Sequence, residues 1–322
     1  MKRGSEGMER ALLRPAQDGG SLPLDLTRTF GRAAPLAIEI GFGGGEALAW
    51  WATRRPEWNF LGFELPMECI ARAAKTLART EVQERVRLVR GDARHLLREL
   101  VPPASAVRAL MQFPMPWPKQ RHAKHRLTDS TFRDGLASAL MPGGRFELVT
   151  DQQVFAEEMS AAFAPDVDFS LTPLEMDPTR AFRTRYERRW LAEGRHIWRM
   201  QATLLRNRSQ LPLSNSDAMQ AFSLAALPDL ASLRALHGRR HSASGGQQVC
   251  EVRDSYVAED GYLIQILAAD EGFSQLFLVR VRTRASGGAI LRLDECARPY
   301  PTPSVQAALL WLQSELGGES VR

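Results

Sequence analysis

The stretch LAIEIGFGGGE at residues 36–46 decides the fold of this 322-residue chain. Its apolar first half predicts a buried strand over residues 36–40, and its glycines predict a tight turn. The Ala- and Trp-rich residues 46–54 then predict a helix. A strand that passes through a glycine turn into a helix opens a parallel α/β unit, so the search for a ligand site begins at this turn.

The same alternation of strand and helix continues as far as residue 150. Further strands are predicted over 59–64, 86–90, 107–113 and 145–150, and further helices over 67–79, 95–100 and 130–140. This order predicts an α/β fold with a mostly parallel, Rossmann-like sheet and helices on both faces. Ligands of such sheets bind beyond the carboxyl ends of the strands, so the residues that follow each strand are the candidates for chemistry.

Four regions are predicted along the chain. Residues 1–35 have loop character and form an N-terminal extension, and residues 36–206 form the α/β domain. Residues 207–247 are rich in Ser, Gly, Asn, Gln and Arg, which predicts a linker with one helix near 217–236. Residues 248–322 hold four closely spaced strand-like runs and a final amphipathic helix, which predict a smaller α+β domain with antiparallel strands.

The composition is that of an ordinary globular protein, with 44% hydrophobic and 25% charged residues. No apolar run approaches the ~20 residues of a membrane helix. Residues 1–20 lack the apolar core of a secretory signal. Cys69, Cys250 and Cys296 form no CxxC pair, which argues against a disulfide framework and against a zinc site. We therefore expect a cytoplasmic protein.

The distribution of charge says more than the net charge of +5. Residues 119–126 contain four Lys or Arg, two His and no acid. Residues 180–199 contain seven Arg and two acids. Two such clusters beside one fold indicate a surface for a polyanion such as RNA, although either cluster taken alone is equally well explained as a solvated face.

The glycine turn favours a cofactor that carries no phosphate. The dinucleotide fingerprint GxGxxG needs a glycine at position 46, where this chain has Glu46. Glu39 would also repel a pyrophosphate, whereas it would attract the sulfonium and ammonium groups of S-adenosylmethionine. An NAD-dependent oxidoreductase is therefore the weaker alternative.

Two further acids stand at the ends of predicted strands. Glu64 ends the second strand about 20 residues after the glycines, where a carboxylate accepts hydrogen bonds from ribose hydroxyls. Asp92 follows the third strand and is placed to meet the adenine amine. The alternative is that both acids are helix caps. The predicted cofactor-binding residues are Glu39, Gly41, Gly43, Gly45, Glu64 and Asp92.

The block FPMPWPKQRHAKHR at residues 113–126 follows the fourth strand. Three prolines around Trp117 exclude a helix or a central strand and predict a stiff loop at the carboxyl edge of the sheet. Trp117 either stacks on a base or anchors this loop in the core. His122 and His125 have no third ligand nearby, so loop packing or phosphate contact is favoured over a metal site.

With these motifs in place, the chain resembles the bacterial tRNA (guanine-N7)-methyltransferase family. That family carries EIGFGxG after its first strand, FPDPWxKxRHxKRR after its fourth, TD after its fifth, and a late T[KR][FY]E. The corresponding segments here are residues 39–45, 113–126, 150–151 and 184–187, and the resemblance spans roughly residues 36–205.

The resemblance implies a class I methyltransferase fold, S-adenosylmethionine as methyl donor, and a guanine in the variable loop of tRNA as target. It also implies that Glu39, Glu64 and Asp92 contact the cofactor. The substrate contacts that it implies are Lys119, Asp151, Thr184, Arg185, Tyr186 and Glu187.

One position departs from the family pattern, because Met115 stands where the family has the catalytic acid of FPDPW. Guanine N7 carries a lone pair and no proton, so the reaction needs no base, and alignment alone contributes about 7–11 kcal/mol at best. We therefore expect an active enzyme with altered positioning. The alternatives are a catalytically impaired tRNA-binding relative and a methyltransferase for a small molecule, the latter opposed by the Arg-rich segment. Residues 210–322 have no recognisable counterpart in the core of the family and are expected to be an added C-terminal domain.

Overall fold

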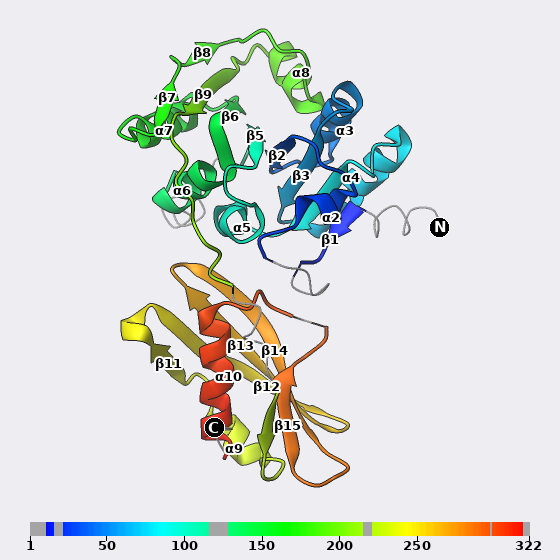
Figure 1. Ribbon diagram of the computed structural model, residues 1–322, viewed down its shortest axis with the longest axis vertical. Coiled ribbons are helices and arrows are strands. Elements are labelled where there is room, and N and C mark those ends of the chain that lie inside the picture. Colours follow the sequence, from blue (N-terminus) through cyan, green and yellow to red (C-terminus); the bar gives the residue numbers. More distant parts are fainter. Residues whose placement is uncertain (1–10, 16–21, 116–127, 215–220, 297, 318–322) are drawn as a thin grey trace. The chain divides into compact units, whose positions relative to one another are not determined.

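The computed structural model describes residues 11–15, 22–115, 128–214, 221–296 and 298–317. Its contacts separate two compact units, one made mainly of residues 23–211 and the other mainly of residues 212–322 (Figure 1). Each unit has its own sheet and its own hydrophobic core, as an independent domain does.

The first unit is built on a nine-stranded sheet. Its strands are β1 (Leu12–Leu13), β2 (Leu36–Ile40), β3 (Asn59–Glu64), β4 (Val86–Arg90), β5 (Ala106–Gln112), β6 (Leu140–Thr150), β7 (Phe169–Leu171), β8 (Glu175–Met176) and β9 (Trp198–Leu204). They lie in the order β1-β4-β3-β2-β5-β6-β9-β7, with β8 also paired to β9. The strands from β1 to β6 are parallel, and only β9 runs antiparallel to its neighbours β6, β7 and β8. The predicted Rossmann-like sheet is confirmed.

Seven helices of this unit connect or flank the strands in the described part of the chain. They are α2 (Leu26–Phe30), α3 (Glu46–Arg54), α4 (Met67–Thr80), α5 (Ala93–Leu100), α6 (Ser130–Ala139), α7 (Gln153–Phe163) and α8 (Arg185–Ala192). Aspartate side chains accept backbone N–H bonds at the starts of α2, α5 and α6, which fixes where those helices begin. In α4 the buried residues recur every three or four positions and join one core cluster with strand residues, as an amphipathic helix requires.

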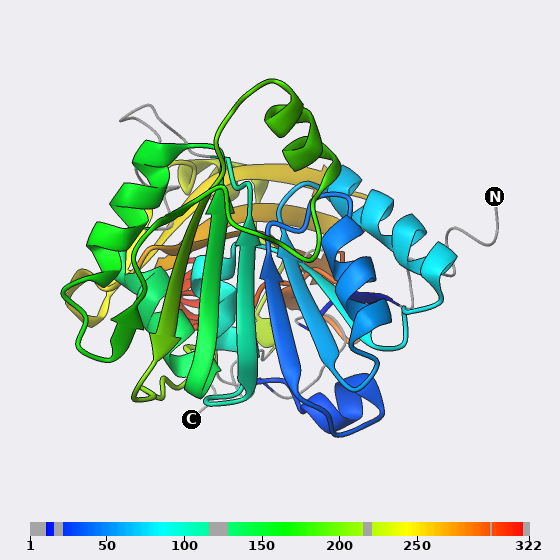
Figure 2. The same cartoon turned by 90° about the horizontal axis from the view of Figure 1, so that it is seen from above.

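The segment between β8 and β9 carries α8 over the carboxyl ends of the central strands (Figure 2). Its base is closed by two hydrogen bonds, one between backbone groups and one from a backbone N–H to a side chain. The Asp177 N–H donates to the Ile197 carbonyl at 2.7 Å, and the Ile197 N–H donates to Asp177 Oδ1 at 2.9 Å. The segment is therefore a long connection whose two ends lie together at the edge of the sheet.

The predicted N-terminal extension is more structured than its loop-like sequence indicates. Leu12 and Leu13 form β1, which pairs in parallel with β4 at the edge of the sheet, and α2 lies within the same region. A two-residue edge strand is too short to leave a periodic signal, so sequence reasoning missed it.

The region predicted as a linker, residues 207–247, also differs from the expectation. It supplies two strands and a short helix to the second unit: β10 (Phe222–Leu224), β11 (Arg240–Ala243) and α9 (Leu230–Ala235). The helix predicted near 217–236 is shorter because Pro228 cannot occupy a helix interior. The polar composition of β11 belongs to an edge strand, where one side of the strand meets water.

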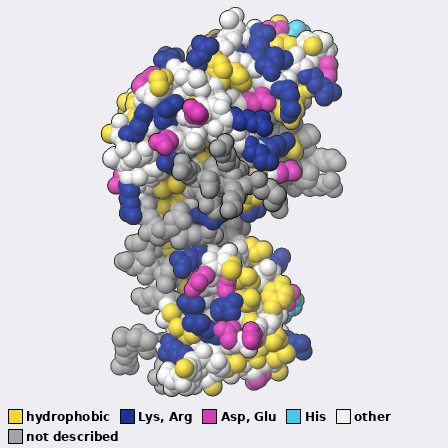
Figure 3. Space-filling view, turned by 90° about the vertical axis from the view of Figure 1, so that its right-hand side faces the viewer, with side chains coloured by type: hydrophobic (Ala, Val, Ile, Leu, Met, Phe, Trp, Pro, Cys, Tyr) yellow, Lys and Arg dark blue, Asp and Glu magenta, His cyan; other side chains and the backbone are white. Residues whose placement is uncertain are grey.

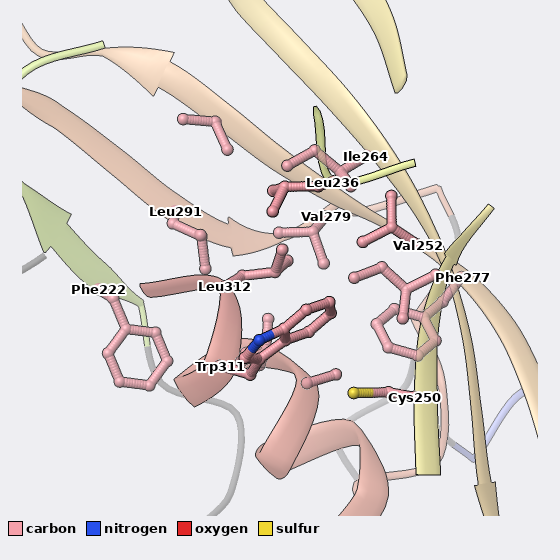
Figure 4. Packing of buried hydrophobic residues seen from close by; sticks show 14 of the residues in the cluster. Phe222, Leu236, Cys250, Val252, Ile264, Phe277, Val279, Leu291, Trp311 and Leu312 are labelled. Carbon is pink, nitrogen blue, oxygen red and sulfur yellow. The ribbon is translucent and has the colours of Figure 1, made fainter. Parts of the chain in front are cut away.

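The second unit is a six-stranded antiparallel sheet with one long helix. Its remaining elements are β12 (Gln248–Ala258), β13 (Gly261–Asp270), β14 (Phe273–Thr283), β15 (Ala289–Leu293), a 3-10 turn η3 (Ser244–Gly246) and α10 (Pro303–Glu315). The strand order is β10-β15-β14-β13-β12-β11. Figure 4 shows Trp311 and Leu312 of α10 among side chains from the sheet, including Val279 and Phe277. The predicted smaller domain with antiparallel strands is confirmed.

None of the helices in the described residues combines the length and the apolar character needed to cross a bilayer.

Candidate functional site

The glycine turn after β2 has the shape that the sequence predicts. Gly41, Gly43 and Gly45 have φ values of 71°, 54° and 75°, which only glycine adopts without strain. A Cβ at Gly45 would lie 2.8 Å from the Ala73 Cβ, so this glycine lets α3 and α4 approach. A Cβ at Gly41 or Gly43 would meet nothing within 4 Å, so the turn faces open space suited to a ligand.

Glu39 is a buried acid whose carboxylate is only partly satisfied. Its side chain is 3% exposed, and Oε1 accepts a 3.4 Å hydrogen bond from Gln112 Nε2. Oε2 has no partner among the described residues. Burial raises the pKa of Glu39 from 4.5 to about 8, against the opposing effects of the Gln112 hydrogen bond and the Arg180 charge. A cation arriving beside it would favour the ionised form.

Glu64 lies at the end of β3 and is bonded to the glycine turn. Its Oε2 accepts the Gly43 N–H at 2.8 Å, and its Oε1 accepts the Leu65 N–H at 2.9 Å. Its charge also contributes to the raised pKa of Glu39, so the two carboxylates lie in one electrostatic environment. Each Glu64 oxygen keeps a second lone pair for a hydroxyl donor.

Asp92 follows β4, where the sequence predicts it, and it is the N-cap of α5. Its Oδ1 accepts the Arg94 N–H at 3.0 Å, and the Arg94 guanidinium pairs with both carboxylate oxygens. Burial opposes ionisation of Asp92, but the bonds and the charge of Arg94 outweigh it and lower the pKa. Asp92 is therefore a helix cap, as the alternative expects, and it is also the ion-pair partner of Arg94.

Arg180 connects Gln112 at the end of β5 to α8 through buried contacts. Its guanidinium donates to Gln112 Oε1 and to Glu187 Oε2, and its side chain is 8% exposed. Because Gln112 in turn donates to Glu39, a continuous chain of hydrogen bonds runs from Glu39 to Glu187. Arg180 belongs by sequence to the predicted polyanion surface, but the structure places it in this internal network.

Glu187 is 1% exposed and is committed to structure. It forms a capping box with Thr184, in which the Glu187 N–H donates to Thr184 Oγ1 at 3.1 Å and the Thr184 N–H donates to Glu187 Oε2 at 3.3 Å. The same oxygen pairs with Arg180. A side chain held in this way fixes the start of α8 and has little capacity left for a substrate. The sequence places Arg180 and Glu187 in the same segment, but it does not predict that these two residues form the ion pair.

Arg185 and Tyr186, at the start of α8, do face solvent. Tyr186 is 51% exposed, with its ring 5.9 Å from that of Trp190 and the Arg185 guanidinium 5.0 Å from its centroid. The Arg185 N–H donates to Glu46 Oε2 at 3.2 Å, which ties α8 to the first turn of α3. Glu46 is a positioning residue that sequence reasoning did not assign to α8.

The segment after β5 begins with a strained residue. Phe113 has a φ of 51° in the left-handed region, its N–H donates to the Val149 carbonyl at 2.7 Å, and its ring packs 5.0 Å from that of Trp190. Met115, two residues on, is 67% exposed. The predicted substrate residue Lys119 lies outside the described residues, as do Trp117, His122 and His125.

Asp151 follows β6, at the same edge of the sheet as the glycine turn. Its side chain is 10% exposed, and Oδ2 accepts bonds from Gln152 Nε2 at 2.8 Å and from Arg195 at 3.2 Å. No group of three or more metal-ligating side chains occurs in the part of the chain that the structure describes.

A parallel sheet in this order, with one antiparallel strand beside β6 and an open glycine turn flanked by carboxylates, defines a Rossmann-like methyltransferase. The family model described as "Putative methyltransferase" matches residues 33–200.

Relatives give a more specific assignment. A tRNA (guanine-N(7)-)-methyltransferase of Thermotoga maritima is 34% identical over 296 residues, covering 91% of this chain and 93% of that protein. One of Nitrosococcus oceani is 38% identical over 181 residues, covering 56% of this chain and 76% of its own. The chain belongs to the tRNA (guanine-N7)-methyltransferase family, whose members use S-adenosylmethionine.

Among solved structures, TrmN from Thermus thermophilus is similar with a TM-score of 0.41 and 19% identity, covering 63% of this chain and 53% of that one.

The Thermotoga alignment of 296 residues is longer than the predicted methyltransferase domain, so it extends into the second unit. The second unit, which matches none of the family's motifs, therefore has a counterpart in at least one relative.

Proposed function

We propose that this protein transfers a methyl group from S-adenosylmethionine to N7 of a guanine in tRNA, in the cytoplasm, with the variable loop as the target region. The observation that carries the proposal is the 34% identity to a tRNA (guanine-N(7)-)-methyltransferase over 91% of the chain. The open glycine turn and the buried, partly unsatisfied Glu39 support it from the side of the cofactor.

The residues at the turn fit the proposed cofactor. Gly41 and Gly43 leave room for it, Glu39 offers a carboxylate oxygen without a partner, and Glu64 offers free lone pairs at the end of β3. When bound, S-adenosylmethionine would supply an electrophilic methyl carbon for in-line attack by guanine N7, with S-adenosylhomocysteine as the leaving group. We assign the ammonium or sulfonium to Glu39, the ribose hydroxyls to Glu64, and the adenine edge to the start of α5 at Asp92.

The remaining residues of the site align the guanine. Its N7 is a nucleophile without deprotonation, so the work of the protein is orientation and exclusion of water. Asp151 is an acceptor for the guanine N1 and N2 donors. Arg185 and Tyr186 present a cation and an aromatic face at the entrance, and Lys119 is assigned to the tRNA backbone. Glu187 and Thr184 act indirectly, because they hold the start of α8 in place.

Met115 is compatible with activity on this chemistry, because no step requires an acid at that position. The alternative of a catalytically impaired tRNA-binding relative is therefore the less favoured one. Incubation of unmodified tRNA transcript with the protein and labelled S-adenosylmethionine, followed by nucleoside mass spectrometry, tests the proposal. We expect 7-methylguanosine, and a higher rate for Met115→Asp. Folded protein that binds the cofactor and tRNA but forms no 7-methylguanosine would contradict the proposal and favour the impaired relative.

A further inference from the structure

A shallow pocket of the first unit lies on the outer side of the glycine turn, between α3, α4 and the start of α8. Its lining residues are Glu46, Ala49, Trp50, Thr53, Arg54, Thr76, Thr80, Phe182 and Arg188. None of them is among the residues assigned above to the cofactor or to the target guanine. The pocket is therefore a separate feature that the proposed reaction does not use.

The pocket has an aromatic pair in its wall. The rings of Trp50 and Phe182 lie 5.3 Å apart at an interplanar angle of 33°, and both side chains are half-buried. The Arg54 guanidinium lies 5.2 Å from the centroid of Trp50. Aromatic faces flanked by arginine are the usual contact surface for unpaired bases of RNA, because every base has a π face.

Cations outnumber acids around the pocket, where α4 and its C-cap also carry the exposed acids Glu68 and Glu81. Arg54 and Arg188 are exposed, and neither is paired with a carboxylate in the described residues. The one lining acid, Glu46, already accepts the Arg185 N–H at 3.2 Å. Further exposed cations on α4 and before α8 are Arg72, Lys75, Arg79 and Arg183. Figure 3 shows Lys and Arg side chains spread over this side of the first unit, interspersed with acidic and hydrophobic side chains.

We propose that this pocket binds one nucleotide of tRNA other than the target guanine, with the base against Trp50 and Phe182 and the phosphate between Arg54 and Arg188. The inference rests on the proposed function, because it takes tRNA as the partner. It extends the tRNA contact surface from α8 around the outside of α3. A free mononucleotide is the competing occupant.

The double variant Arg54→Ala/Arg188→Ala tests the phosphate contact, with Arg28→Ala/Arg145→Ala as a matched control that also removes two exposed charges. Arg28 is also exposed on a helix, but α2 precedes β2 and so lies toward the amino ends of the strands. Affinity for unmodified tRNA is measured by filter binding between 0.05 and 0.4 M KCl, without methyl donor. Loss of one phosphate contact lowers the slope of log K against log salt by about 0.7–0.9, which is roughly five- to eightfold weaker binding at 0.1 M salt if the curves meet at 1 M.

The variant Trp50→Leu tests the base contact separately. It keeps an apolar side chain in the pocket, and we expect weaker tRNA binding with an unchanged salt slope. Affinity for S-adenosylhomocysteine, measured by calorimetry, is expected to stay at the wild-type value in all three variants. An Arg54→Ala/Arg188→Ala variant with the same affinity and slope as Arg28→Ala/Arg145→Ala would overturn the proposal. So would saturable binding of AMP that the double variant abolishes while tRNA binding stays unchanged.

The binding assay is independent of methyl transfer, so the two proposals fail separately. If the double variant shows the expected slope change but the wild-type protein forms no 7-methylguanosine, the proposed reaction is refuted and the pocket assignment is supported.

Discussion

Replacement of Glu39 by glutamine tests the cofactor assignment and its physical cause together. Glu39 is 3% exposed, and burial raises its pKa from 4.5 to about 8. Between these two values the folded protein keeps a proton that the unfolded chain has released, so the folded state binds more protons. The contribution of Glu39 to stability must therefore fall as the pH rises through this window. Glutamine does not titrate, so the variant lacks this component.

The expected size follows from the two pKa values. Between pH 5 and pH 7.5 the buried carboxyl removes about 3 kcal/mol from the free energy of unfolding of the wild-type protein. Urea-induced unfolding of both proteins at the two pH values, followed by circular dichroism, measures the difference. All other titrating groups are common to both proteins and cancel. Glu39→Gln is expected to lose less stability than the wild type over this range, and parallel pH dependences would refute the reasoning.

Cofactor binding should show the opposite trend in the wild-type protein. If the cation of S-adenosylmethionine needs the ionised carboxylate, its affinity rises roughly twentyfold between pH 6 and pH 7.5 as Glu39 becomes easier to ionise. The measurement stops at pH 7.5 because an α-amino group titrates near 7.7–8.0. Calorimetry in buffers of different ionisation enthalpy should also record the release of nearly one proton at pH 7. Glu39→Gln should bind weakly, without this pH dependence or proton release.

Three further predictions concern the architecture of the site. Arg180→Met should lower the free energy of unfolding by about 3–5 kcal/mol, because Glu187 is left buried without its cation. The double variant Arg180→Met/Glu187→Leu should recover most of this loss, as measured by urea-induced unfolding. Equal stability of the single and double variants would contradict this account. Gly45→Ala should lower the free energy of unfolding by about 2–4 kcal/mol, because it adds a clash with Ala73 to the strain of a positive φ. Gly31 has a φ of 69° and no neighbour within 4 Å, so Gly31→Ala should lower it by only about 1–2 kcal/mol in the same assay. Asp151→Asn should lower kcat/KM for tRNA about tenfold or more, with the affinity for S-adenosylhomocysteine unchanged, and an unaltered kcat/KM would remove Asp151 from the guanine site.

The core of the first unit was predictable because its signals are local. Apolar runs ending in glycine or acid, separated by helical periodicity, placed β2, β3 and β4 and their following helices nearly residue for residue. The short edge strands β1, β10 and β11 were not predictable, because two to four residues carry no period and their pairing depends on distant partners. No strand was predicted at β9, and its antiparallel direction depends on which strand it meets and not on its own composition.

The site was predictable in its positions but less so in its partnerships. Glu39, Glu64 and Asp92 stand at strand ends as expected, since the order of elements fixes where a strand ends. The commitment of Glu187 to Arg180 was not visible, because seven arginines of the same segment offer equivalent charges in the sequence. Burial distinguishes them: Arg180 is 8% exposed, while Arg183 is 46% exposed.

The closed base of the α8 segment has a consequence for engineering. Hydrogen bonds between Asp177 and Ile197 hold the two ends of the segment together, so residues 178–196 form an insertion at one point of the sheet edge. Short, fixed end-to-end spacing is the condition under which loops are exchanged between homologous scaffolds without unravelling the host. A chimera that takes this segment from a relative must keep Arg180 and Glu187 together, because they form an ion pair. It must also retain Gln112 and Glu46, because these residues accept hydrogen bonds from Arg180 and from the Arg185 N–H.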